Sequence, residues 1–276
     1  MGTRVVGVHG IGNHQANMGA TEAAALLNQK WSTALRRGLG QHAQLEFHVA
    51  YYAHHLAADT AQGITHPEHL SQPEQQMLLS WATALGAPAE VAQGRLMTPA
   101  RQATDWIAHR YGLDHHLVRL LVTTFCREVH TYLNDDDRRS AAQNEVAATI
   151  TDQHADLVIA HSLGSVVTFE TLWAHPDIQV DLLLTLGSPL AMPDVIFPKL
   201  RPTPADGAGH RPPGVQRWIN ITDPGDFIAI PRQLGTYFEG VSADLTTPIA
   251  IFDMHKVTNY LACTTTAAAL ASAGSW

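Results

Sequence analysis

The sequence predicts an α/β fold, with a mostly parallel central sheet flanked by helices. Near the start of the chain, a β-rich run at 4–8 precedes an amphipathic helix at 20–37, and an alternating strand follows at 45–52. A strand–helix–strand succession of this kind implies that the two strands pair in parallel. Later, apolar runs at 157–160, 180–186 and 216–222 end in turn residues, as buried strands do.

Composition limits the class of protein. The chain has 276 residues, of which 45% are hydrophobic and 15% charged, and this is typical of a globular protein with one large core. The net charge is −8, and no basic stripe is interleaved with aromatic residues. We therefore expect neither nucleic acid nor an anionic membrane as an electrostatic partner.

Targeting and cysteine patterns add little to this description. Cys126 and Cys263 lie far apart and match no metal or redox spacing. No apolar stretch is long enough to span a bilayer, and no signal-peptide pattern is found. We expect a cytoplasmic protein without a stable membrane anchor, and the sequence leaves its oligomeric state open.

We interpret residues 1–276 as a single domain with a helical insertion at 53–137. Helical periodicity near 74–85, 99–111 and 116–133 is broken by glycine and proline, and the strand pattern does not continue there. The insertion precedes the run at 157–160, where it is a candidate cap over an active site. Extra helices packed against one flank of the sheet are the alternative.

Histidines and acidic residues in this region do not predict a metal site. His66 and His69 are separated by Pro67, and no carboxylate or thiolate completes a convincing ligand set. The pairs at 54–55 and 115–116 are expected by chance among 17 histidines. The acidic triplet at 135–137 is better explained as the start of a helix that runs to about residue 153. We predict no metal and no cofactor.

A serine lies at the apex of a tight turn after the run at 157–160. Small residues surround it in the pattern Ala160-x-Ser162-x-Gly164, and helical spacing follows. Such a turn presents one hydroxyl above the edge of a sheet; alternatively, the serine is only a helix N-cap.

Near the N-terminus, His9-Gly10-Ile11-Gly12 forms a second turn at a strand end. Phosphate binding there is disfavoured, because the chain lacks the complete glycine spacing of nucleotide-binding loops.

Two further residues of catalytic type follow late strands. Asp226 lies in the turn at 223–229, which also contains Asp223, after the predicted strand at 216–222. His255 lies between a strand-like run at 248–252 and a predicted helix at 256–271. Carboxylate and imidazole groups placed this way can orient and activate a serine hydroxyl.

Together these residues resemble the α/β-hydrolase superfamily, in particular lipases and serine esterases. His9-Gly10-Ile11-Gly12 resembles the HGxG oxyanion loop, and 160–164 resembles the G-x-S-x-G nucleophile elbow, with alanine in place of the first glycine. A Gly187-Ser188-Pro189 turn at a neighbouring strand end is also similar to those enzymes, and the resemblance covers most of the chain outside 53–137. It implies an α/β-hydrolase fold and the following roles: Ser162 as nucleophile, His255 as base, Asp226 rather than Asp223 as acid, and the N–H groups of Ile11 and Leu163 as oxyanion donors.

The resemblance also implies a function. We expect a serine hydrolase that cleaves a carboxylic ester through an acyl-enzyme intermediate and needs no cofactor. Its partner would be a small-molecule acyl ester, with lipid-like esters included. Thioesterase, amidase and acyltransferase activities use the same machinery and stay open. A protein that binds a ligand or partner on the same fold without catalysis is the remaining alternative.

Overall fold

A six-stranded sheet forms the centre of the computed structural model, which describes residues 2–40, 45–57, 66–92, 98–249 and 253–272. The strand order is β2-β1-β3-β4-β6-β8, and every pairing in this sheet is parallel. These findings confirm the predicted α/β class. The strands are β1 (Thr3–Val8), β2 (Leu45–Ala50), β3 (Leu157–His161), β4 (Val180–Leu186), β6 (Val215–Thr222) and β8 (Ala243–Thr246); β5 (Gly209–His210) and β7 (Phe238–Glu239) form a separate pair.

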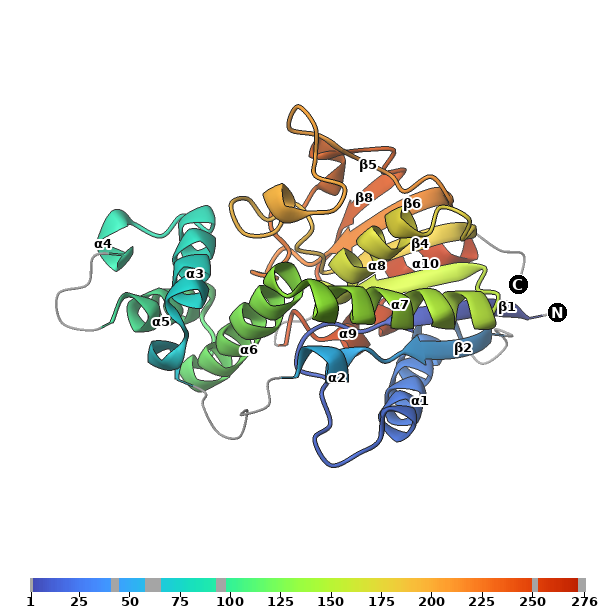
Figure 1. Cartoon of the computed structure of the whole chain (residues 1–276), viewed down its shortest axis with the longest axis horizontal. Helices are drawn as coiled ribbons and strands as arrows, with labels where there is room; N and C mark the ends of the chain where they lie inside the picture. The colour runs from blue at the N-terminus through green and yellow to red at the C-terminus, as the bar shows by residue number, and fades with distance from the viewer. Residues whose placement is uncertain (1, 41–44, 58–65, 93–97, 250–252, 273–276) are drawn as a thin grey trace.

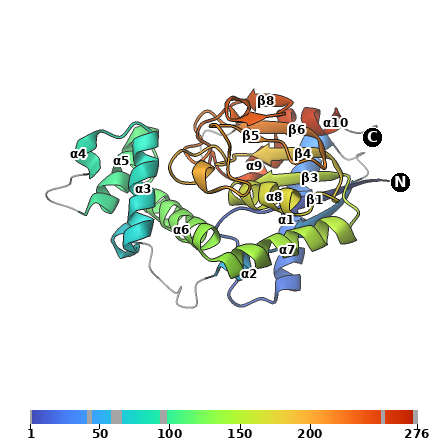
Figure 2. The same ribbon diagram turned by 45° about the horizontal axis from the view of Figure 1, so that its top comes forward.

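Helices cover both faces of the sheet (Figures 1 and 2). On one face lie α7 (Asp136–Asp152) and α8 (Leu163–Ala174), and on the other lie α1 (Ala20–Leu39), α9 (Val257–Ala262) and α10 (Thr264–Ala271). Alternate residues of β3 belong to the two cores: Val158 and Ala160 pack with α7 and α8, whereas Leu157 and Ile159 pack with α1 and α10. Burial on both faces explains why this strand is a continuous apolar run.

Between β2 and α7 the described residues contain helices and no strand. These are α2 (Ala53–Leu56), the 3₁₀ helix Pro67–His69, α3 (Gln72–Ala84), α4 (Ala89–Ala92), α5 (Pro99–Tyr111) and α6 (His115–Asn134). In both views α3, α4 and α5 lie beyond the end of the sheet, and α6 leads back to it (Figures 1 and 2). Trp81 of α3 donates from Nε1 to the carbonyl of Phe227, at 3.0 Å, and the two rings stack. These helices therefore contact the loop that carries Asp226.

The C-terminal region differs from the prediction of one helix at 256–271. The structure has two helices, α9 and α10, because Cys263 between them adopts an extended conformation. Its sulfur accepts from the N–H of Thr266 and caps α10, and the Thr266 hydroxyl donates to the carbonyl of Tyr260 at 2.7 Å. Of the predicted strand-like run at 248–252, residues 250–252 lie outside the described residues, and the edge strand is instead β8.

Both cysteines are free thiols; Cys126 is buried in α6. Within the described residues, no helix has the combination of length and apolar character that crossing a bilayer requires.

A buried ion pair anchors α8, the helix that follows Ser162. Glu170 of α8 and Arg139 of α7 are 0% and 2% exposed and form a bidentate pair. The Glu170 carboxylate also accepts from the Tyr132 hydroxyl at 2.7 Å, from the Gln143 amide at 2.9 Å and from the Arg201 N–H at 2.9 Å. The carboxylate thus joins α6 and α7 to α8, and the charge that it buries is fully hydrogen-bonded.

We predict that Arg139→Met lowers the free energy of unfolding by about 3–5 kcal/mol, because it leaves the Glu170 carboxylate buried without its cation. Urea denaturation followed by circular dichroism measures this change. Adding Glu170→Leu to the same chain should recover part of the loss. Arg4→Met removes the partly exposed Arg4–Asp156 pair and should change little. Equal effects of Arg4→Met and Arg139→Met would contradict the prediction.

Candidate active site

Ser162 lies in a strained turn between β3 and α8. Its φ of +53° and ψ of −131° are unusual for a residue with a side chain, and its N–H donates to the carbonyl of Leu186 on the neighbouring strand, at 3.1 Å. Strain of this kind is concentrated at functional sites. The turn places the serine at the carboxyl end of the parallel strands, where open α/β sheets form their sites.

The small residues around the serine permit the turn. A Cβ at Gly164 would lie 2.5 Å from the carbonyl oxygen of Val8 and would also collide with that of His9, so α8 can meet the end of β1 only at a glycine. Ala160 differs, because its methyl group is fully buried in the apolar core beneath α8. Alanine in place of the first glycine therefore fits this turn.

The structure brings Ser162, His255 and Asp226 together in one hydrogen-bonded chain. His255 Nε2 lies 2.8 Å from Ser162 Oγ, and His255 Nδ1 lies 2.7 Å from Asp226 Oδ2. Ser162 and Asp226 have no exposed surface, and the side chain of His255 is 9% exposed. With Asp226 accepting the proton of Nδ1, the Nε2 lone pair faces the serine hydroxyl.

The two aspartates of the 223–229 turn have different partners. Asp226 Oδ1 accepts from the N–H groups of Ile228 and Ala229, at 3.0 and 3.3 Å, and Oδ2 accepts from the Tyr260 hydroxyl at 2.8 Å. Asp223 instead accepts from the backbone N–H groups of Gly225, at 2.7 Å, and Ile249, at 2.6 Å. Asp223 thus shapes the turn, and Asp226 faces the histidine.

The loop at 9–12 packs against Ser162. A Cβ at Gly10 would lie 2.5 Å from Ser162 Cβ, so the predicted oxyanion loop is within contact distance of the nucleophile. Ile11 follows in this loop, and Leu163 is the first residue of α8 and is fully buried. Both backbone segments that carry the predicted oxyanion donors therefore adjoin Ser162.

His9 holds this loop in place. Burial lowers its pKa to about 4, so the ring is neutral; Nδ1 donates to the Gly10 carbonyl at 2.8 Å, and Nε2 accepts from the Tyr52 N–H at 3.2 Å. The Tyr52 hydroxyl donates to the carbonyl of His9 at 2.7 Å, and the two rings stack. His9 therefore positions the backbone and is not aimed at Ser162.

Two neighbours of the site had no assigned role from the sequence. His161 Nε2 donates to the carbonyl of His255 at 2.9 Å; burial, and then the nearby His255, lowers the pKa of His161 well below its usual value. Gly187 has φ +55°, and a Cβ there would lie 2.8 Å from Asp226 Oδ2 and 3.3 Å from His255 Nδ1. The only sequence signal for either residue is its position within a recognised motif, His161 in the pattern at 160–164 and Gly187 in the Gly187-Ser188-Pro189 turn.

Glu128 of α6 is a third neighbour of the site to which the sequence assigns no role. Its carboxylate accepts from the Gly12 N–H at 3.0 Å and so links α6 to the loop at 9–12. Burial raises the pKa of Glu128 to about 7, although the Gly12 hydrogen bond opposes this shift. No motif predicts Glu128, because its partner lies 116 residues away in the chain.

An apolar cavity of about 330 Å³ opens beside His255 and Asp226. Leu113, Leu117, Val118 and Leu121 line it from the helical segment, and Phe227 and Met254 line it from the loops of the sheet. A second cavity, of about 400 Å³, lies beside Arg4 and Asp156 at the amino ends of the strands, away from these groups. Of these two cavities, only the first adjoins His255 and Asp226.

Comparisons of the chain with protein-family models, with curated proteins and with solved structures find no match.

We predict that Glu128→Gln stabilises the protein at pH 8 and has little effect near pH 4.5. The raised pKa means that the folded state binds more protons than the unfolded state between about pH 4.5 and 7, so wild-type stability falls as the pH rises through this window. Glutamine keeps an acceptor for Gly12 and does not titrate. Because Glu128 is only half-buried, we expect a gain of about 1–2 kcal/mol.

Urea denaturation of both proteins at several pH values measures this difference. A difference between them that does not vary from pH 4.5 to 8 would show that Glu128 titrates alike in the folded and unfolded states.

Proposed function

We propose that this protein is a serine hydrolase of the α/β-hydrolase fold that cleaves carboxylic esters through an acyl-enzyme intermediate. The observation that carries the proposal is the chain of hydrogen bonds from Ser162 through His255 to Asp226, at the carboxyl edge of a parallel sheet. A serine hydroxyl needs an adjacent base to act as a nucleophile, and the base needs a third group to orient it. All three are present at hydrogen-bonding distance.

The proposed reaction has two steps. His255 Nε2 accepts the Ser162 proton as Oγ attacks the acyl carbon, and it then protonates the leaving alcohol. In the second step His255 takes a proton from the water that attacks the acyl carbon, and it then passes this proton to Ser162 Oγ as the acyl–oxygen bond breaks and the acid leaves. Asp226 keeps the Nδ1 proton in place and stabilises the imidazolium. The N–H groups of Ile11 and Leu163 stabilise the oxyanion, and one such donor typically contributes about 2.7–4 kcal/mol to the transition state.

The apolar cavity supports an ester with an apolar chain as the substrate. Four of its lining residues are aliphatic side chains of the helical segment at 113–121, and the cavity reaches His255. Burial of hydrocarbon there would contribute about 0.8 kcal/mol for each methylene group. Thioester, amide and acyl-transfer reactions use the same groups and are tested alongside esters. The two free thiols fit a reducing compartment such as the cytoplasm.

We predict that a fluorophosphonate probe labels the wild-type protein and that Ser162→Ala abolishes the labelling, because the probe reacts with an activated serine hydroxyl. Ser32→Ala is the matched control and should keep the label, since Ser32 lies on α1, on the opposite face of the sheet from α8. In p-nitrophenyl ester hydrolysis, Asp226→Asn should lower kcat by roughly 10⁴-fold. Asp223→Asn should cost much less.

Absence of labelling in folded wild-type protein would refute the catalytic proposal. A larger loss for Asp223→Asn than for Asp226→Asn would refute the assignment of the acid.

We also predict that Leu121→Trp shifts chain-length preference. Tryptophan at this lining position fills the cavity, so kcat/KM for p-nitrophenyl octanoate should fall by about tenfold or more relative to the acetate. Leu120→Trp is the matched control, because Leu120 is 42% exposed on the same helix and does not line the cavity. An unchanged octanoate-to-acetate ratio in Leu121→Trp would exclude the cavity as the acyl site.

A further inference from the structure

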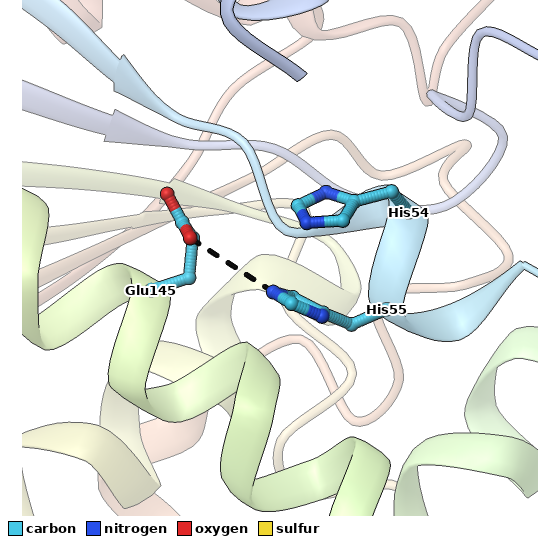
Figure 3. Close-up of side chains that lie close together, drawn as sticks. All are labelled: His54, His55 and Glu145. Carbon is cyan, nitrogen blue, oxygen red and sulfur yellow. Dashed lines mark ion pairs between the residues drawn. The ribbon is translucent and has the colours of Figure 1, made fainter. Parts of the chain in front are cut away.

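Three potential metal ligands converge at the junction of α2 and α7. His54 and His55 lie on α2, Glu145 lies on α7, and one ligand atom from each lies within 4.8 Å of the other two. His55 Nε2 is 3.8 Å from Glu145 Oε2, and the two imidazole rings are 3.9 Å apart between centroids. In Figure 3 both rings extend from α2 toward the Glu145 carboxylate on α7. From the sequence alone, the pair His54-His55 is expected by chance among 17 histidines.

The donor set has a recognisable chemistry. Imidazole nitrogens with a carboxylate oxygen suit Zn²⁺ and other borderline transition ions, and they do not suit Ca²⁺ or Mg²⁺. At bond lengths of about 2.0–2.1 Å, tetrahedral ligand atoms are separated by about 3.4 Å. The three side chains are partly exposed, so small rotations would close the present spacing.

Neighbouring residues fix the position of α2 relative to α7. Arg138, two turns before Glu145 on α7, donates from Nη1 to the carbonyls of Ala57, at 2.6 Å, and His55, at 3.3 Å. The Tyr51 ring stacks on His54, with 5.6 Å between centroids and 15° between planes. The backbone of α2 is thus fixed to α7 beside the converging ligands, as a preorganised site requires.

Other histidines do not make a comparable set. His66 and His69 have ring centroids 5.6 Å apart, and His66 Nδ1 lies 3.7 Å from Glu68. Within the part of the chain that the structure describes, however, only the group of His54, His55 and Glu145 places three ligand atoms close enough to share one ion.

We propose that His54, His55 and Glu145 bind a Zn²⁺ ion that links α2 to α7, with water completing the coordination. The ion would act structurally. Tyr52, which holds His9 through its N–H and hydroxyl, immediately precedes α2, so the ion fixes the segment that supports the loop at 9–12. This proposal does not depend on the proposed hydrolase activity.

The test is calorimetric titration of ZnCl₂ into full-length protein that has been treated with a chelator. We expect one Zn²⁺ ion per chain with micromolar or tighter affinity, and a higher melting temperature in saturating Zn²⁺. His54→Ala, His55→Ala and Glu145→Gln should each weaken binding by about tenfold or more, since even outer-shell partners contribute about 10–100-fold. The double variant His66→Ala/His69→Ala should bind as the wild type does.

Direct measurement of binding separates this test from the catalytic proposal. No heat of binding in wild-type protein, or wild-type affinity in both Glu145→Gln and His54→Ala, would overturn the site and leave a simple ion pair between His55 and Glu145. Binding lost equally in the His66→Ala/His69→Ala control would place the ion elsewhere. Circular dichroism of each variant checks that the fold is intact.

Discussion

The contact between the first turn of α8 and the end of β1 sets the geometry of the whole site. Gly164 packs against the carbonyls of Val8 and His9, at a distance that leaves no space for a side chain. This approach fixes where α8 begins and therefore where Ser162 turns. It also leaves Gly10 against Ser162 Cβ, so the loop at 9–12 and the proposed nucleophile are held together by close packing. On the other side of the loop, the stacked rings of His9 and Tyr52 complete the support.

Two buried carboxylates and one half-buried carboxylate are stabilised to very different degrees. The side chains of Glu170 and Asp226 have no exposed surface. Glu170 accepts hydrogen bonds from Arg139, Tyr132 and Gln143. Asp226 accepts from two backbone N–H groups, from Tyr260 and from His255. Glu128 accepts from the Gly12 N–H, and burial there raises its pKa. The first two carboxylates fix the position of α8 and of the His255 ring. The third links α6 to the loop at 9–12, and its ionisation opposes folding.

Local patterns were sufficient to predict the α/β class, the parallel strands and the chain order of Ser162, Asp226 and His255, because strand periodicity and tight turns depend on neighbouring residues. The break at Cys263 was missed, because a side-chain cap leaves helical periodicity unchanged. β8 was missed because its residues are only partly buried and form no apolar run. Glu128 and Glu145 could not be predicted, since each acquires its partner only when distant segments fold together.

The complete burial of Ser162 has a kinetic consequence. In the proposed hydrolase, an acyl group would reach Oγ only in conformers that expose it, and the observed rate would be the intrinsic rate multiplied by the population of those conformers. If they make up about 1% of molecules, every substrate loses about a hundredfold in apparent affinity, whatever its chemistry. Water is subject to the same restriction, and an acyl-enzyme formed in this enclosed site would be protected from it. The partition of the acyl group between water and another acceptor would then depend on which of them enters when the site opens.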